Sequence, residues 1–205
     1  MNSITVNFEN LTKEEREQLL LLVEKSNNKK VPLSEIKIGQ TFKIGKYSFI
    51  KIYEACGVTK AVSKESVCKM YFGKNNNFAE SDVLKYLYDK VLPKLISAVG
   101  EDNILPIETS LTTLDGVKTF GIITSKISLP TLDFYRDNVD IFDKYKLDEY
   151  WWLATPYSAK PHYNSLHVLY VSPCGNVYDH SYLNKSGVRP FCRFKSSISV
   201  LPENL

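Results

Sequence analysis

The spacing of hydrophobic and polar positions divides the chain into a short N-terminal segment and a longer region. Apolar residues alternate with polar ones over residues 4–8 and predict a strand. Thr12 and Glu15 have the spacing of a capping box, in which each side chain bonds the other residue's backbone N–H, and the apolar positions that follow predict a helix to about residue 26. We therefore expect a strand–helix appendage over residues 1–30 and a separate domain over residues 31–205.

Apolar pairs two residues apart recur between residues 36 and 52 and predict two or three antiparallel strands, with the lysines on the solvated face. The adjacent Phe49 and Ile50 interrupt the alternation, which predicts a bulge there. A further strand is expected near residues 69–72 and another over residues 120–123.

Helical spacing of apolar residues begins after Ser81 and continues to Val99. Pro93 lies inside this pattern, so the sequence predicts either a kinked helix or a second helix that ends at Gly100. Thr131 is a candidate cap for a short third helix.

The C-terminal region has a pattern typical of β structure. Residues 166–171 alternate, a turn is expected over residues 172–176, and a return strand begins at Val177. The polar segments 158–164 and 178–186 are expected to form loops at one end of this sheet.

Composition is that of a globular protein: 205 residues, 43% hydrophobic and 24% charged. The longest apolar run is far shorter than the roughly 18 residues of a membrane helix, and the N-terminus does not have the pattern of a secretory signal. Four cysteines without a CxxC pair favour reduced, mostly buried thiols. We therefore expect a cytoplasmic protein without a membrane partner.

The net charge of +3 conceals a basic block, because residues 25–74 contain eleven lysines and three glutamates. Such a block can meet phosphates or an acidic protein. It contains no arginine, the residue favoured for bidentate phosphate or base contacts, so a solvated lysine face is the preferred interpretation and nucleic acid is a weak alternative.

Six ordered segments resemble a family known mostly as a domain of unknown function in bacteriophages and prophages of Gram-positive bacteria. The segments are NNFAESDVLKYL (76–87), ILPIETSLTTLDG (104–116), SLPTLDFYRDN (128–138), WWLATP (151–156), VLYVSPCGNV (168–177) and GVRPFCRF (187–194). The C-terminal signature is similar to that of C-type-lectin-like domains, which include retroelement variable proteins and the formylglycine-generating-enzyme superfamily. Its residues here are Trp151, Trp152, Pro156, Gly175, Gly187, Arg189 and Pro190.

The resemblance implies an α+β, C-type-lectin-like mixed fold with small twisted antiparallel sheets, two or three helices and much irregular chain. It also implies a scaffold that displays a binding surface. Because fold analogy alone does not determine function, the residues have to be weighed individually.

Successive side chains of a strand face opposite ways, so Trp151 and Trp152 cannot enter the same core layer. We expect one inside and the other in a second layer or in solvent, where it could contact a ligand. Arg189, between a valine and a proline, is expected to be half-buried and paired with carbonyls or a carboxylate, in preference to clamping a ligand.

The two polar C-terminal segments are rich in Tyr, Ser, Asn and His, the composition of adaptable binding loops. An ordinary polar loop is the competing interpretation. The candidate binding residues are Tyr157, His162, Tyr163, Asn164, Tyr178, His180, Tyr182 and Asn184.

No catalytic residue or cofactor is predicted. His162, His167 and His180 do not have the spacing of a metal site, and the chain contains no nucleophile elbow or phosphate-binding glycine motif.

We expect a non-enzymatic recognition module of phage or prophage origin that acts in the host cytoplasm on a protein or glycan partner. The sequence leaves homo-oligomer formation and association with the virion open. The first alternative is a phage-encoded inhibitor of a host defence protein, similar to an anti-CRISPR, or of a protein that acts on nucleic acid, with residues 25–74 as its contact face. The second is a metal-dependent, oxidase-like enzyme.

Overall fold

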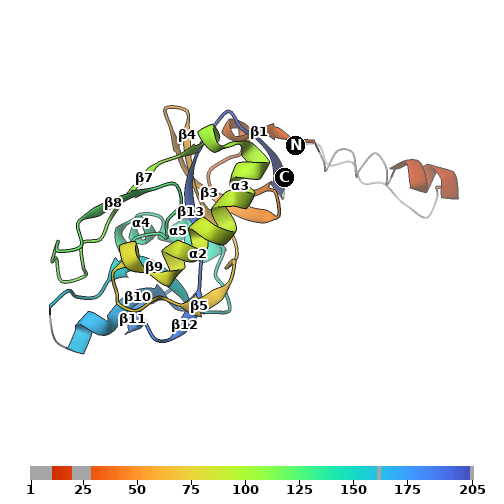
Figure 1. Ribbon diagram of the computed structural model, residues 1–205. Helices are drawn as coiled ribbons and strands as arrows, with labels where there is room; N and C mark the ends of the chain where they lie inside the picture. Colours follow the sequence, from red (N-terminus) through yellow and green to blue (C-terminus); the bar gives the residue numbers. More distant parts are fainter. Residues whose placement is uncertain (1–10, 20–28, 161–162, 204–205) are drawn as a thin grey trace.

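The computed structural model describes residues 11–19, 29–160 and 163–203 (Figure 1). It shows a mixed α+β fold with mostly antiparallel sheets, which confirms the predicted class. Residues 13–19 are helical. From residue 29 on, the described chain has four α-helices, not two or three: α2 (Asp82–Tyr86), α3 (Leu92–Val99), α4 (Leu132–Arg136) and α5 (Val139–Lys144).

The largest sheet has seven antiparallel strands in the order β1-β14-β2-β3-β4-β13-β6. Its strands are β1 (Val31–Pro32), β2 (Thr41–Ile44), β3 (Tyr47–Ala55), β4 (Val58–Ser63), β6 (Ile104–Leu105), β13 (Phe191–Lys195) and β14 (Ser199–Glu203). The last two strands of the chain therefore lie inside this sheet, between strands formed much earlier in the sequence.

A second sheet has five strands in the order β11-β10-β9-β12-β5, and β12 and β9 are its one parallel pair. Its strands are β5 (Lys69–Tyr71), β9 (Trp151–Pro156), β10 (His167–Val171), β11 (Val177–Ser181) and β12 (Lys185–Gly187). A two-stranded sheet pairs β7 (Ile107–Ser110) with β8 (Ile122–Ser125), two residues beyond the expected start at Phe120.

The predicted strands between residues 36 and 52 are partly confirmed. The β2–β3 hairpin is present, but Ile36 and Ile38 lie outside strands, after a 3-10 turn at Leu33–Glu35. Phe49 and Ile50 are both buried because β3 has a hydrophobic core on each face. The bulge lies slightly further on, where the register shifts between Lys51 and Tyr53.

Lys51 contradicts the prediction that the lysines of this region lie on a solvated face. Its side chain is 1% exposed, and Nζ donates to the Leu33 carbonyl at 2.9 Å and to Glu54 Oε2 at 2.6 Å. The hydrogen bonds to the Leu33 carbonyl and the Glu54 carboxylate offset the cost of burying the ammonium group. Lys69 belongs to the second sheet, so the basic block is divided between two sheets.

The long helical pattern after Ser81 forms two helices. The Ser81 hydroxyl accepts from the Leu84 N–H at 3.0 Å and caps α2, and a π-helical turn at Leu87–Val91 connects α2 to α3. Pro93 lies in the first turn of α3, directly after the π-helical turn. Gly100 ends α3 with a φ of 84°, as predicted.

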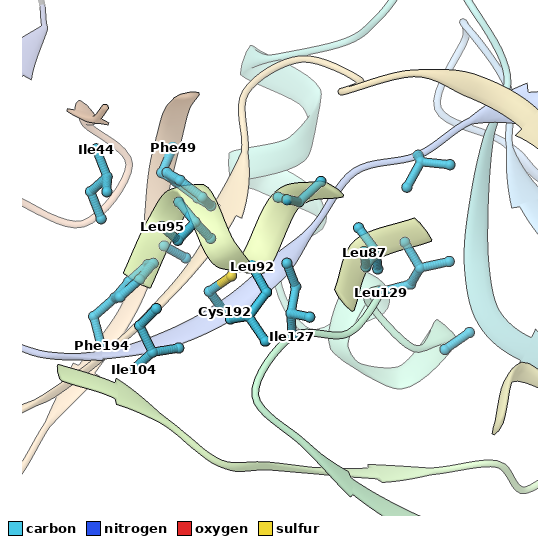
Figure 2. Close-up of a cluster of buried hydrophobic side chains, with 14 of the residues drawn as sticks. Ile44, Phe49, Leu87, Leu92, Leu95, Ile104, Ile127, Leu129, Cys192 and Phe194 are labelled. Atoms are coloured by element: carbon cyan, nitrogen blue, oxygen red, sulfur yellow. The ribbon is translucent and has the colours of Figure 1, made fainter. Parts of the chain in front are cut away.

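Two hydrophobic clusters stabilise the fold. The first includes residues of α2 and α3, and α3 lies in front of the seven-stranded sheet in Figure 1. Figure 2 shows Leu95 of α3 grouped with Phe49 and Phe194. The second lies on the other side of the central strands and includes Tyr135 and Phe142 from α4 and α5. Both clusters reach the second sheet through β9, so this strand joins them.

The N-terminal capping box is confirmed. Thr12 N donates to Glu15 Oε2 at 2.8 Å, and Glu15 N donates to Thr12 Oγ1 at 3.3 Å. The bonds that the Glu15 carboxylate accepts from Thr12 N and Thr12 Oγ1 lower its pKa. The predicted strand over residues 4–8 and the helix end near residue 26 lie outside the described residues. The cap on α4 is also confirmed, because Thr131 Oγ1 accepts from the Phe134 N–H at 3.2 Å.

Candidate binding surface

Trp151 and Trp152 occupy opposite faces of β9, which confirms the prediction that they enter different layers. Trp152 is fully buried in the first cluster, and its Nε1 donates to the Met70 carbonyl at 3.1 Å. Trp151 is 2% exposed in the second cluster and stacks on Phe142, with 5.7 Å between ring centroids. Neither tryptophan is a surface anchor, so the ligand interpretation of these two residues is wrong.

Arg189 is more buried than predicted, with 1% of its surface exposed. Its Nε donates to the Ser63 carbonyl at 3.0 Å, Nη2 donates to the Lys64 carbonyl at 3.2 Å, and the guanidinium lies 4.8 Å from the Trp151 ring centroid. Burial lowers the pKa of Arg189 to about 10. This value is still well above 7, so the guanidinium is charged at neutral pH. Arg189 thus fastens the residues after β4 to the second cluster, the structural role that the sequence favours.

The two signature glycines lie where side chains of other segments come close to the backbone. Gly175 has a φ of 87°, and its carbonyl accepts from the Tyr135 hydroxyl at 2.6 Å. A Cβ at Gly187 would lie 3.0 Å from Glu149 Oε1 and still nearer the Ser66 hydroxyl, so a side chain fits there only if these two side chains move.

The two signature prolines supply backbone acceptors. The Pro156 carbonyl, at the end of β9, accepts from the Leu114 N–H at 3.0 Å. The Pro190 carbonyl accepts from the Ser63 N–H at 2.9 Å. Prolines and glycines of the signature therefore hold the strand ends together.

A row of aromatic residues crosses the second sheet on the face that carries Trp152. Tyr170 on β10 pairs with Trp152 on one side and with Tyr178 of β11 on the other. The Tyr170 ring centroid lies 5.0 Å from that of Tyr150, 6.2 Å from that of Tyr178 and 5.4 Å from that of His180. We call Tyr150, Tyr170, Tyr178 and His180 the tyrosine face.

The inner part of this face is anchored and the outer part is open. Tyr170 packs partly against the first cluster, whereas Tyr178 is 52% exposed and Tyr150 is 46% exposed. Burial and the neighbouring tyrosines raise the Tyr170 pKa, so its hydroxyl stays protonated at neutral pH. Rigid rings with hydroxyl groups can stack on a sugar ring or fill a pocket of a protein partner.

The sequence prediction named half of the tyrosine face. Tyr178 and His180 belong to it, but they lie on strand β11 and not in a loop, because residues 177–181 and 185–187 are strands. Tyr150 and Tyr170 were missed. Alternation shows which residues of one strand share a face. Only the pairing of β9, β10 and β11 shows that Tyr170 lies next to Trp152 and Tyr178.

Other candidate binding residues have different places. Tyr182 is half-buried against the first cluster, its N–H donates to the Leu166 carbonyl at 3.0 Å, and its carbonyl accepts from the Phe72 N–H at 3.1 Å. Tyr157 is half-buried against the second cluster. Asn184 closes the turn between β11 and β12 by donating its N–H to the Ser181 carbonyl at 3.0 Å. Each of these three residues therefore makes a contact within the fold, and its part in binding a partner stays a prediction.

Three candidates cannot be placed on any surface. His162 lies outside the described residues, and Tyr163 and Asn164 begin a 3-10 turn, Tyr163–Leu166, in which their side chains are not described. His167 is described and lies on the opposite face of β10, where Nδ1 is 2.5 Å from Asp179 Oδ2. Within the described ranges, no group of three His, Cys, Asp or Glu residues is arranged to hold a metal ion.

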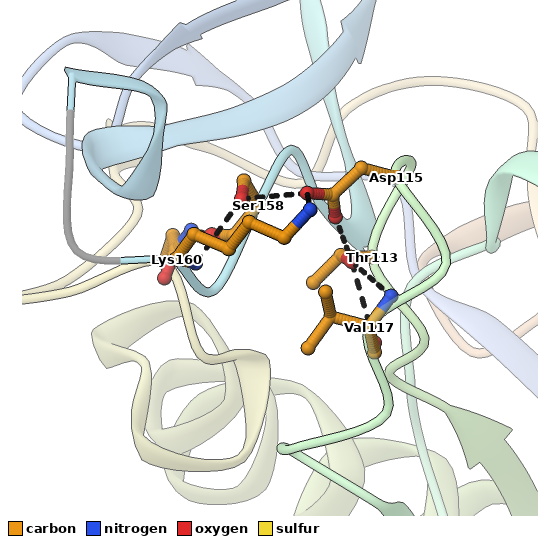
Figure 3. A network of polar contacts seen from close by, with 6 residues as sticks. Thr113, Asp115, Val117, Ser158 and Lys160 are labelled. Carbon is orange, nitrogen blue, oxygen red and sulfur yellow. Dashed lines mark hydrogen bonds and ion pairs between the residues drawn. The ribbon is translucent and has the colours of Figure 1, made fainter.

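The segment after β9 is tied down by a polar network around Asp115 (Figure 3). The Asp115 carboxylate accepts from the Thr113 hydroxyl and, at 2.9 Å, from Ser158 Oγ, and it pairs with Lys160 Nζ at 3.3 Å. The Thr113 hydrogen bond is the main cause of the lowering of the Asp115 pKa to about 2, with further contributions from Ser158 and Lys160. The network joins residues 158–160 to the turn at residues 113–117.

No protein-family model matches the chain, and no curated protein or solved structure matches it. Among the described residues, no helix has the length and apolar character needed to cross a membrane.

Proposed function

We propose that this chain is a non-enzymatic recognition module of phage or prophage origin, built on a C-type-lectin-like fold, that binds a protein or glycan partner through the tyrosine face. The observation that supports this most strongly is the exposure of Tyr178 and Tyr150 on either side of the anchored Tyr170. Tyrosine contributes a large contact area and loses little conformational entropy on binding, and the row across β9, β10 and β11 already fixes these rings.

Apolar side chains next to this end of the sheet extend the candidate surface. Leu183, in the turn after β11, is 63% exposed, and Leu166, before β10, is 47% exposed. The hydrogen bond from Tyr182 N to the Leu166 carbonyl joins the two segments. Exposed apolar side chains grouped on one surface can contribute to binding a partner.

The test compares the double variant Tyr150→Ala/Tyr178→Ala with the unmodified chain as baits in lysate of a Gram-positive host and on a glycan array. We expect a specific protein or glycan to be retained by the unmodified chain and lost by the double variant. The matched control is Tyr53→Ala, since Tyr53 is 46% exposed but lies on β3, outside the tyrosine face. Retention of the same partner by the double variant would refute the assignment.

Tyr178→Phe separates two modes of contact within this proposal. The variant keeps the ring and removes the hydroxyl group. If partner binding survives in Tyr178→Phe and not in Tyr178→Ala, stacking or packing of the ring is the main interaction.

A further inference from the structure

A cavity of about 400 Å³ lies between the seven-stranded sheet, the β7–β8 pair and α4. Its walls include Lys60 of β4, Phe191 and Arg193 of β13, Glu108 of β7 and Phe134 of α4. None of the four residues of the tyrosine face lines it, so this cavity is separate from the proposed partner surface. Its volume is in the range of small-molecule sites, roughly 300–1,000 Å³.

Two cations stand side by side on its wall. Lys60 and Arg193 are direct cross-strand partners of β4 and β13, and like charges in that position destabilise a sheet. Neither residue forms an ion pair with any part of the described chain, including Glu108 on the facing wall. Lys60 Nζ instead lies 5.0 Å from the ring centroid of Tyr53. The positive pair therefore has no compensating carboxylate within the described residues.

Arg193 is oriented so that one edge of its guanidinium is unused. Nη1 donates to the Pro106 carbonyl at 2.7 Å, which fixes the group. Nε is buried and has no hydrogen-bond partner among the described residues. Nε and Nη2 lie along the same edge of a guanidinium and together donate two parallel hydrogen bonds to a carboxylate. A buried donor without a partner is costly, and a rotation of the Arg193 side chain that brings Nε to a bound oxyanion would remove that cost.

The other side of the cavity is apolar. The rings of Phe134 and Phe191 are 4.5 Å apart between centroids, and Ile107 and Leu129, both buried, lie beside them. A ligand that only neutralised the cations would leave the exposed parts of Phe134 and Phe191 in contact with water. The site therefore fits a molecule with both a carboxylate and an apolar group.

We propose that this cavity is a second binding site, for an organic carboxylate that carries an apolar or aromatic group. The carboxylate takes the Nε–Nη2 edge of Arg193 with Lys60 beside it, and the apolar group packs on Phe134 and Phe191. Such a ligand is either a free carboxylic acid or the C-terminal residue of a peptide, since both present the same chemistry. This site stands independently of the tyrosine face.

The decisive probe pair is N-acetyl-L-phenylalanine and its amide, titrated into the ¹⁵N-labelled full chain and followed by NMR chemical shifts. We expect the acid to shift resonances of β4, β13 and α4 in a saturable way, and the amide to bind at least ten-fold more weakly. Equal effects of the acid and the amide, or shifts confined to other parts of the chain, would overturn the proposal. This comparison needs no variant, so it does not depend on how a substitution affects folding.

Variants and a peptide then refine the result. Arg193→Gln should weaken binding of the acid at least ten-fold, whereas Arg136→Gln should leave it unchanged, because Arg136 is exposed on α4 and does not line the cavity. Unchanged binding by a folded Arg193→Gln variant contradicts the assignment. Gly-Gly-Phe with a free carboxylate distinguishes the two ligand sources: tighter binding than the free acid supports a chain terminus, and weaker binding supports a free acid.

Discussion

Trp151 and Trp152 are neighbours in the chain, yet their indoles lie in different hydrophobic clusters on opposite sides of β9. The Trp152 ring meets Phe72 edge-on, with 5.6 Å between centroids, and the Trp151 ring meets Tyr135 edge-on at 5.8 Å. One dipeptide therefore holds both cores to the same strand.

Replacing either tryptophan should destabilise the fold. Trp152→Phe removes the donor to the Met70 carbonyl and leaves a void. Trp151→Phe reduces the ring area on which the Arg189 guanidinium stacks. We expect each variant to lose about 1–3 kcal/mol of unfolding free energy in urea denaturation. A change below about 0.5 kcal/mol, typical of surface positions, would show that the residue is not a core anchor.

Arg189→Ala should be among the most damaging single substitutions. It leaves the carbonyls of Ser63 and Lys64 without their donors and opens a cavity next to Trp151. We expect a loss of about 3 kcal/mol or more, measured by chemical denaturation. Arg136→Ala, at an exposed position of α4, is the matched control and should change stability by less than about 0.5 kcal/mol.

Asp115 gives the fold a specific sensitivity to acid. Its folded pKa of about 2 lies below its ordinary value of 3.8, so the carboxylate stabilises the folded state above pH 4 and this contribution is lost as the pH falls towards 2. In a series of melting temperatures between pH 5 and pH 2, the unmodified chain should fall more steeply than Asp115→Asn. Parallel curves for the two proteins would contradict the network around this residue.

Tyr182 and Tyr178 should respond differently to alanine substitution. Tyr182 packs against the first cluster, so Tyr182→Ala should cost about 1–3 kcal/mol and lower the melting temperature. Tyr178 is 52% exposed, and Tyr178→Ala should cost less than about 1 kcal/mol. Thermal denaturation of both variants tests this, and a loss of partner binding is interpretable only for the variant that keeps its stability.

Salt dependence distinguishes the tyrosine face from the lysine-rich block. Binding through neutral rings should weaken less than about three-fold between 50 and 200 mM salt, whereas several phosphate contacts would cost about 10³-fold or more. Affinity for the captured partner at several salt concentrations provides the measurement. A steep loss would favour the alternative in which residues 25–74 contact nucleic acid or a protein that acts on it.

Patterns of neighbouring residues correctly predicted helix caps and a helix end. The capping box at Thr12 and Glu15, the cap at Thr131 and the helix end at Gly100 depend on residues within a few positions, and each is confirmed. The burial of Trp151 and Trp152 on opposite faces of one strand also follows from strand geometry alone.

Long-range pairing limited what the sequence could show. The local pattern places Lys51 on a solvated face because its acceptor, the Leu33 carbonyl, comes from a distant turn. The composition of residues 178–186 predicts a loop, whereas β12 is a strand only through its pairing with β5 and β9. For the same reason, Tyr150 and Tyr170 become part of one surface only after β9, β10 and β11 are aligned.

The position of β13 and β14 within the seven-stranded sheet affects how the chain is made. β13 separates β4 from β6, and β14 separates β1 from β2, so four strands synthesised earlier have to wait for partners from residues 191–203. On the ribosome, these early strands would expose unpaired edges until that segment emerges. The seven-stranded sheet is therefore expected to form slowly, and only after residues 191–203 have left the ribosome.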